Sequence, residues 1–260
     1  MALLQTLIRT QTPAPPKMIV YGQPGVGKTT FAASAGAILI DCENGAGAIP
    51  DLSRTPYLKS WTEIRNWLVE LAENTPKDLQ VLAVDTLDWM VTRIVEYVIV
   101  DLDPKSGGDL RNTIGSSHGG YFKARDIVNN VVYRDLIPLL NTINAKGIAI
   151  VLLAHASNEK MKTPEGFDIR LAAPDLPNWI LPTFVEWCDA VLYATRDGNK
   201  RTLRTEGTNV VMAKNRYGLP AEIEFSWPVL MEAMYSNPTA ANHVVVANDT
   251  PAEQQKQPAA

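Results

Sequence analysis

Four short runs of consecutive apolar residues stand out along the first two thirds of the chain. They lie at residues 18–21, 37–40, 81–84 and 148–153. No polar residue interrupts any of them, as expected for strands that are buried on both faces of a parallel sheet. The pattern therefore predicts a sheet whose central strands are covered by other elements on each side.

Helical periodicity occurs between these runs. Apolar residues recur at the spacing of one helix face at Ile64, Trp67, Leu68 and Leu71. Just before them, Ser60 and Glu63 fit a capping box, in which the serine side chain accepts from a first-turn amide and the glutamate reaches back. Residues 30–35, between the first two runs, also have a helical pattern. Strands and helices therefore alternate.

The pattern changes after residue 189. Residues 190–194, 201–204 and 210–213 are predicted strands, and the first two are joined near Asp197-Gly198-Asn199, a sequence typical of hairpin turns. Alternating strands and helices followed by hairpins predict an α/β fold, with a mainly parallel central sheet and an antiparallel β extension.

The two ends of the chain differ from the middle in composition. Residues 12–16 are proline-rich and are expected to run extended, while the last residues are mostly Ala, Asn, Gln and Pro and offer little to bury. We expect an N-terminal extended segment over residues 1–16, one domain over residues 17–236 and a flexible tail over residues 237–260. Apolar side chains in the first segment are candidates for a subunit contact: Leu3, Leu4, Leu7 and Ile8.

The strongest motif follows the first apolar run. Residues 22–29 match G-x-x-x-x-G-K-[ST] at every fixed position, with a predicted strand before and a predicted helix after. Backbone N–H groups of such a loop cradle phosphates, the lysine reaches the β- and γ-phosphates, and the Thr hydroxyl binds Mg²⁺. A glycine-rich turn with a surface lysine is the disfavoured alternative. The expected nucleotide-binding residues are Gly22, Gln23, Pro24, Gly25, Val26, Gly27, Lys28, Thr29 and Thr30.

Acidic residues follow two of the predicted strands. Asp85 ends the third run, where ligands of open α/β sheets gather, so we expect it to hold Mg²⁺ through water; an ordinary strand-ending acid is the alternative. Residue 86 is Thr, which disfavours the motor-type ATPases that place a catalytic glutamate there. Glu43, after the second run, can orient or deprotonate the attacking water. Asp41 competes with it, and Asp88 is interpreted as a surface or capping group.

His155 closes the fourth run. A polar residue there can contact the γ-phosphate and report its state to the following loop. A histidine satisfied by a backbone carbonyl is the equally weighted alternative.

Taken in order, the motifs resemble those of the RecA-like recombinase ATPases, and within them the short phage-borne single-strand annealing ATPases. The resemblance covers roughly residues 17–227. It implies that Glu43 is the catalytic glutamate and that His155 stands where the family usually has a glutamine phosphate sensor. It further implies that Lys214 and Arg216 reach across a subunit interface to the neighbour's γ-phosphate. Such cations stabilise the charge that develops in the transition state.

The resemblance also implies partners. The family binds single-stranded DNA through two mobile loops, which correspond here to residues 103–120, with Arg111, and residues 156–178. The second segment carries Lys160, Lys162 and Arg170. ATP and Mg²⁺ are the implied cofactors. Single-stranded DNA, further copies of the chain in a ring or filament, and a single-strand DNA-binding protein are the implied partners.

Composition and charge narrow this picture. The 260 residues are 46% hydrophobic and 20% charged, with a net charge of -4, which excludes indiscriminate coating of nucleic acid. Residues 41–103 carry 12 acidic and 5 basic side chains, and residues 196–216 carry 6 basic and 2 acidic ones, a split that suits head-to-tail subunit contacts. Two cysteines and the lack of a signal peptide or transmembrane run predict a cytoplasmic protein without a membrane partner.

The sequence thus predicts a P-loop ATPase that binds ATP, Mg²⁺ and single-stranded DNA and acts in recombination by annealing or pairing strands. Two alternatives stay open. One is a nucleotide switch that loads a replication partner without turnover. The other is a P-loop small-molecule kinase, which would need an arginine-rich lid and an acceptor pocket.

Overall fold

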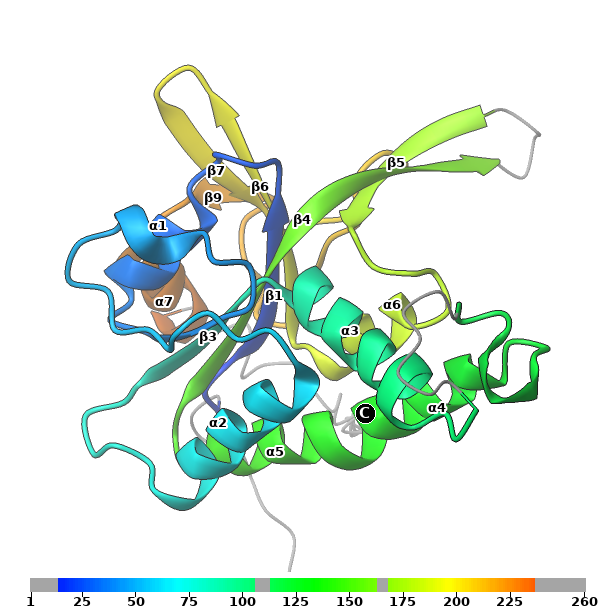
Figure 1. Ribbon diagram of the computed structural model, residues 1–260. Coiled ribbons are helices and arrows are strands. Elements are labelled where there is room, and N and C mark those ends of the chain that lie inside the picture. Colours follow the sequence, from blue (N-terminus) through cyan, green and yellow to red (C-terminus); the bar gives the residue numbers. More distant parts are fainter. Residues whose placement is uncertain (1–13, 106–112, 163–167, 237–260) are drawn as a thin grey trace, which may run out of the picture.

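The computed structural model describes residues 14–105, 113–162 and 168–236. Within these ranges nine strands form one sheet, in the order β2-β3-β4-β1-β6-β7-β9, with β5 paired to β4 and β8 to β6 (Figure 1). The strands are β1 (Lys17–Gly22), β2 (Ile38–Asp41), β3 (Val81–Asp85), β4 (Ala149–Lys162), β5 (Asp168–Pro174), β6 (Ala190–Asp197), β7 (Lys200–Arg204), β8 (Lys214–Asn215) and β9 (Glu222–Glu224).

The sheet has a parallel centre and an antiparallel margin, which confirms the predicted fold class. The five neighbouring strands β2, β3, β4, β1 and β6 are parallel to one another. In contrast, β5, β7, β8 and β9 pair antiparallel to their neighbours. Since parallel strands end at the same edge, Gly22 pairs with His155 of β4 and Asp41 pairs with Asp85. This register brings the ends of β1, β2 and β3 to the same edge of the sheet as His155, which lies within β4.

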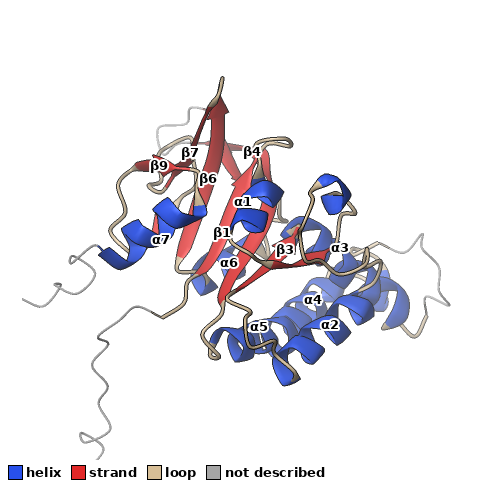
Figure 2. Cartoon of the chain, turned by 90° about the vertical axis from the view of Figure 1, so that its left-hand side faces the viewer, coloured by secondary structure: helices blue, strands red, loops and turns tan. Residues whose placement is uncertain are grey.

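Helices cover both faces of the sheet (Figures 1 and 2). α1 and α7 pack on one face, and α2 to α6 pack on the other. The α-helices are α1 (Lys28–Ser34), α2 (Trp61–Glu73), α3 (Leu87–Glu96), α4 (Lys123–Val131), α5 (Ile137–Asn144), α6 (Leu181–Trp187) and α7 (Trp227–Ser236). Shorter helical turns lie at Ala46–Ala48, Tyr97–Asp101, Ser117–Gly119 and Val132–Leu136. None of the helices in the described ranges is long and apolar enough to cross a membrane.

The apolar runs serve both faces, as their unbroken character predicts. In β1, Ile19 and Tyr21 join the core beneath α2 to α6, while Met18 and Val20 join the core beneath α1 and α7. Successive side chains of a strand point to opposite faces, so a strand buried on both sides needs apolar residues throughout.

The predicted helix over residues 60–71 is confirmed as α2, with its capping box. The Ser60 hydroxyl accepts from the Glu63 amide at 3.2 Å, and the Glu63 carboxylate accepts from the Ser60 amide at the same distance. The buried row is Trp61, Ile64, Leu68 and Leu71. Trp67 lies at the edge of this stripe and is 38% exposed, so its placement on the core face was only partly right.

Two sequence predictions about the later segments were wrong. Residues 210–213 do not form a strand: Val211 makes isolated bridges, and the paired segment is β8, further along the chain. Residues 156–178 are not a long loop, because the second half of β4 pairs with β5 in a ladder from Ala156↔Pro174 to Lys162↔Asp168. This ladder extends away from the body of the domain (Figure 1). Cross-strand pairing satisfies the backbone there, although the segment has few large apolar residues.

Several predictions concern residues outside the described ranges. These are the apolar side chains among residues 1–13, the Gly-rich stretch with Arg111 in residues 106–112, and the tail over residues 237–260.

Candidate functional site

The G-x-x-x-x-G-K-T loop connects the end of β1 to the start of α1. Gly27 has a φ of 109°, a conformation that favours glycine. A Cβ atom on Gly22 would lie 2.6 Å from the Ala194 carbonyl oxygen of β6, so the backbone of the neighbouring strand requires glycine there. The loop thus depends on glycine at two positions for two different reasons.

Lys28 is folded back onto this loop. Its Nζ donates to the carbonyl oxygens of Gly22 at 3.0 Å and Gln23 at 3.3 Å, and the residue is only 6% exposed. Burial lowers the pKa of Lys28, and the nearby carboxylates of Asp85 and Glu43 oppose that change. The ammonium group is therefore held inside the loop by acceptors that a phosphate oxygen could replace.

Thr29 and Asp85 come together at the loop. The Thr29 hydroxyl donates to Asp85 Oδ2 at 2.8 Å. Burial raises the pKa of Asp85 to about 6, and the charge of Glu43 adds to this effect, while the hydrogen bond from Thr29 acts against it. Asp85 is 4% exposed. Burial disfavours the ionised form of such a carboxylate, and a cation bound beside it would stabilise that form.

The Thr29–Asp85 pair fits Mg²⁺. This cation takes oxygen ligands, and it is usually held by one or two protein groups together with substrate phosphates and water. Among the residues that the structure describes, no group of three or more His, Cys, Asp or Glu side chains could hold a metal. A site of one hydroxyl and one carboxylate beside a phosphate-binding loop therefore suits Mg²⁺ and does not suit a metal that needs a full protein ligand set.

Glu43 and Asp41 have separate roles at the end of β2. Asp41 is 1% exposed; its Oδ1 accepts from the amides of Asn44 at 2.6 Å and Glu43 at 3.3 Å, and its Oδ2 pairs with Arg54 at 3.1 Å. Asp41 thus builds the turn. Glu43, which this turn presents, lines the cavity at the P-loop.

His155 links Glu43 to Asp88. Its Nδ1 lies 2.9 Å from Asp88 Oδ2, its amide donates to Asp88 Oδ1 at 3.0 Å, and its Nε2 lies 3.6 Å from Glu43 Oε1. The hydrogen bond with Asp88 raises the pKa of His155. Burial disfavours the Asp88 carboxylate, yet its bonds with His155 hold the pKa of Asp88 below the usual range.

Asp88 corrects the sequence interpretation. It lies in the first turn of α3, but its side chain is 15% exposed and is turned toward His155. It is therefore neither a surface acid nor a cap of its own helix. The His155 ring is hydrogen-bonded to a carboxylate, and not to a backbone carbonyl as in the alternative interpretation. Because the two residues are 67 positions apart, no local sequence signal reveals this contact.

These groups meet in a cavity of about 300 Å³ at the P-loop. Of the residues proposed from the sequence, Pro24, Gly25, Gly27, Lys28, Thr29, Thr30, Asp85, Glu43 and His155 line it. Arg201 of β7 lines it as well, a contribution that the sequence analysis missed. The arrangement combines phosphate donors, a metal-binding pair and a carboxylate that can face a water molecule.

Lys214 and Arg216 are not among the residues that line this cavity. Lys214 Nζ donates to the carbonyl oxygens of Val185 at 2.7 Å and Cys188 at 2.8 Å, so within its own chain it caps the end of α6. Arg216 Nη1 lies 3.3 Å from Asp189 Oδ1, and its side chain is 58% exposed. Their action on a neighbouring subunit stays a prediction.

Comparison with known proteins adds a family match. A family model described as an AAA domain matches residues 14–217. No curated protein sequence matches the chain significantly. Among solved structures, a chain described as the crystal structure of the RadB recombinase is 15% identical, with 73% of this chain and 80% of that chain covered and a TM-score of 0.41.

Proposed function

The chain belongs to the AAA-domain family, and from this premise we propose that it is an ATPase that binds ATP with Mg²⁺ at the P-loop cavity and acts on single-stranded DNA in recombination. One observation carries the proposal. The loop residues Pro24, Gly25, Gly27, Lys28 and Thr29 line one cavity together with Asp85, Glu43 and His155, and the Thr29 hydroxyl donates to Asp85 there.

The residues divide the work of phosphoryl transfer between them. Lys28 exchanges its loop carbonyls for phosphate oxygens, and Thr29 and Asp85 hold the metal. Held by Thr29 and Asp85, Mg²⁺ would neutralise the negative charge that develops on the phosphates. Glu43 orients the attacking water and accepts its proton.

His155 is proposed to sense the γ-phosphate. Because the Asp88 carboxylate can only accept, the proton between them lies on Nδ1, and Nε2 is left facing Glu43 and the cavity. His155 is also the last residue of β4 that pairs with β1, and the ladder with β5 begins at the next residue, Ala156. A change at its ring is thus placed to reach the β4–β5 ladder.

Two features support single-stranded DNA as the partner. In the β4–β5 ladder, Arg170 of β5 is exposed, so its guanidinium can contact a phosphate group. Beside the other proposed DNA-binding segment, Tyr121 is 92% and Phe122 is 50% exposed, and Arg125 stacks over the Phe122 ring at 4.0 Å. Exposed aromatic rings beside cations are typical of single-strand binding surfaces.

The proposed assembly and cellular location are taken from the resemblance to the RecA-like recombinase ATPases. We propose a ring or filament in which exposed Arg216 reaches the neighbour's γ-phosphate, as in the short phage-borne annealing ATPases, with a single-strand DNA-binding protein as a further partner. The buried, unpaired thiols of Cys42 and Cys188 suit a reducing compartment such as the host cytoplasm.

The test is the rate of ATP hydrolysis with and without single-stranded DNA, with Glu43→Gln as control. We expect single-stranded DNA to raise the rate of ATP hydrolysis. Glu43→Gln should abolish hydrolysis while ATP binding persists. Tight ATP binding without turnover in the presence of DNA would contradict an ATPase and favour a nucleotide switch. Phosphoryl transfer to a small metabolite without DNA would favour a kinase.

A further inference from the structure

Arg201 reaches over the P-loop from a distant part of the chain. It lies on β7, 174 positions after Gly27, yet a Cβ atom on Gly27 would be 2.9 Å from Arg201 Nη1 and 3.3 Å from its Cζ. Its guanidinium therefore packs against the Cα of the glycine that precedes Lys28. Arg201 also lines the same cavity as Lys28, Asp85 and His155.

The charge of Arg201 has no protein partner. Across residues 14–105, 113–162 and 168–236, no hydrogen bond or ion pair involves its guanidinium. The nearby arginines differ: Arg196 Nε donates to the Gly198 carbonyl at 2.9 Å, and Arg204 Nε lies 3.2 Å from Glu222 Oε1. A guanidinium offers five donors in a planar fork that matches phosphate oxygens.

The backbone holds Arg201 in this position. Its carbonyl accepts from the Phe225 amide at 3.1 Å, and the Phe225 ring stacks on Phe31 of α1 with centroids 4.8 Å apart. Phe31 lies two residues after Thr29, the last residue of the loop. Phe225 thus connects the strand that carries Arg201 to the helix that carries Lys28. These contacts fix the position of the Arg201 backbone relative to Lys28.

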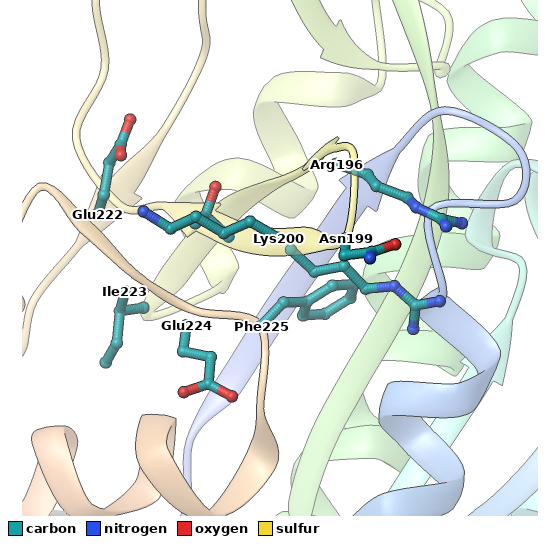
Figure 3. A pocket seen from close by; sticks show the side chains of 9 residues that line it. Arg196, Asn199, Lys200, Glu222, Ile223, Glu224 and Phe225 are labelled. Carbon is teal, nitrogen blue, oxygen red and sulfur yellow. The ribbon is translucent and has the colours of Figure 1, made fainter.

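A second cavity begins at Arg201. It has a volume of about 670 Å³ and is lined by the β6–β7 hairpin and by residues 222–225 (Figure 3). Arg201 lines both cavities, so it stands between the phosphate-binding loop and a space large enough for the rest of a nucleotide. Figure 3 shows the Lys200 side chain extending away from that of Arg196, and Lys200 does not line the P-loop cavity.

We propose that Arg201 is a phosphate-binding residue of the nucleotide site, supplied by the same subunit that supplies the P-loop. It binds non-bridging oxygens of the phosphate chain from the β7 side. This inference rests on the proposed nucleotide site and adds to it a residue from the antiparallel margin of the sheet, which local motifs do not mark.

The test is equilibrium binding of a non-hydrolysable ATP analogue with Mg²⁺ to the full chain, followed by competition with inorganic tripolyphosphate. Arg201→Ala should weaken the affinity for both ligands by about 10- to 100-fold, because a hydrogen-bonded charge pair is lost. Arg201→Lys, which keeps the charge and loses the fork, is expected to fall between Arg201→Ala and the unmodified chain. Arg204→Ala is the matched control, because it removes one positive charge from the same strand and Arg204 lines neither cavity, and it should change affinity by less than about threefold.

The outcomes separate this inference from the function on which it rests. If the unmodified chain and Arg201→Ala bind equally while Lys28→Ala loses the analogue, the role of Arg201 is overturned and the nucleotide site stands. If the unmodified chain binds neither ligand, the nucleotide site fails and Arg201 with it. Should Arg201→Ala melt at a lower temperature, the Arg201→Lys and tripolyphosphate measurements decide: undiminished tripolyphosphate affinity in Arg201→Lys overturns the proposal, and a weakened affinity supports it.

Discussion

His155 and Asp88 are joined by two hydrogen bonds: the backbone amide of His155 donates to one carboxylate oxygen at 3.0 Å, and its ring Nδ1 lies 2.9 Å from the other. This double contact fixes the ring at the point where β4 leaves the parallel sheet. It also places a charge-sensitive group 3.6 Å from Glu43.

The first prediction concerns the charge of His155. Asp88→Asn should lower the pKa of His155, because it removes the hydrogen bond and the negative charge that raise this pKa, while burial and the charge of Lys28 still lower it. NMR titration of the imidazole protons measures this, with His118→Gln to help assign the signals. A His155 pKa that is the same in Asp88→Asn and the unmodified chain would refute the coupling.

The raised pKa of His155 also determines how its contribution to folding stability changes with pH. The folded pKa of His155 lies above the unfolded value, so its contribution is fully present below about pH 6.5 and is lost as the pH rises through the folded pKa. Asp88→Asn should therefore destabilise the chain more at about pH 6 than at about pH 9.

The second prediction concerns the cost of keeping Asp85 ionised. Its folded pKa of about 6 is above the ordinary value of 3.8, so the folded state binds the proton more tightly and this group lowers stability as the pH rises from about 4 through about 6. At pH 8, without Mg²⁺ or nucleotide, Asp85→Asn should raise the free energy of unfolding by on the order of 1–3 kcal/mol.

Thermal melting at about pH 8 and about pH 4.5 checks this second prediction. The gain should shrink at the lower pH, where Asp85 is largely protonated in the folded chain. The same substitution should weaken Mg²⁺-dependent nucleotide binding. A variant that is less stable than the unmodified chain at pH 8 would contradict a desolvated carboxylate.

The third prediction separates the two acids of the β2 turn. Glu43→Gln should leave thermal stability and ATP binding near those of the unmodified chain and reduce hydrolysis by about 100-fold or more. Asp41→Asn should instead lower the melting temperature, because Asp41 pairs with Arg54 and caps the turn amides. The pair of melting curves and ATPase rates gives the measurement; reversed behaviour of the two variants would exchange their roles.

The fourth prediction separates Lys214 from Arg216. Arg216→Ala should spare ATP binding and folding and remove DNA-stimulated turnover, because its side chain is exposed and paired only at the surface. Lys214→Ala should lower stability by about 1–2 kcal/mol, since it leaves the carbonyls at the end of α6 without their donor. Normal stimulated hydrolysis by Arg216→Ala would rule out the role across the interface.

The parallel sheet and the P-loop were predictable because their signals are local. An unbroken apolar run marks a strand buried on both faces, and G-x-x-x-x-G-K-T is a contiguous pattern. The position of β2 beside β3, which brings Glu43 to the cavity, follows from the pairing of Asp41 with Asp85. No local pattern in the sequence fixes the order of strands in a sheet, so the place of β2 beside β3 was not predictable.

What could not be predicted depends on contacts between distant residues. Asp88 of α3 meets His155 only because β3 lies beside β4, and Arg201 meets Gly27 only after β7 is placed beside β6. Lys214 precedes a turn in the sequence, but only the tertiary structure shows that the end of α6 lies within reach of its ammonium group. The β4–β5 ladder was missed because the backbone pairing that forms it has no local apolar pattern to mark it.

The central claim is that the loop at residues 22–29 binds the phosphates of ATP. Equilibrium binding of ATP with Mg²⁺ to the unmodified chain and to Lys28→Ala tests it most directly, with matching melting curves as evidence that the variant folds. We expect the unmodified chain to bind and Lys28→Ala to lose measurable binding, because the ammonium held inside the loop is the proposed ligand of the β- and γ-phosphates. An ATP affinity that Lys28→Ala leaves unchanged would contradict the assignment.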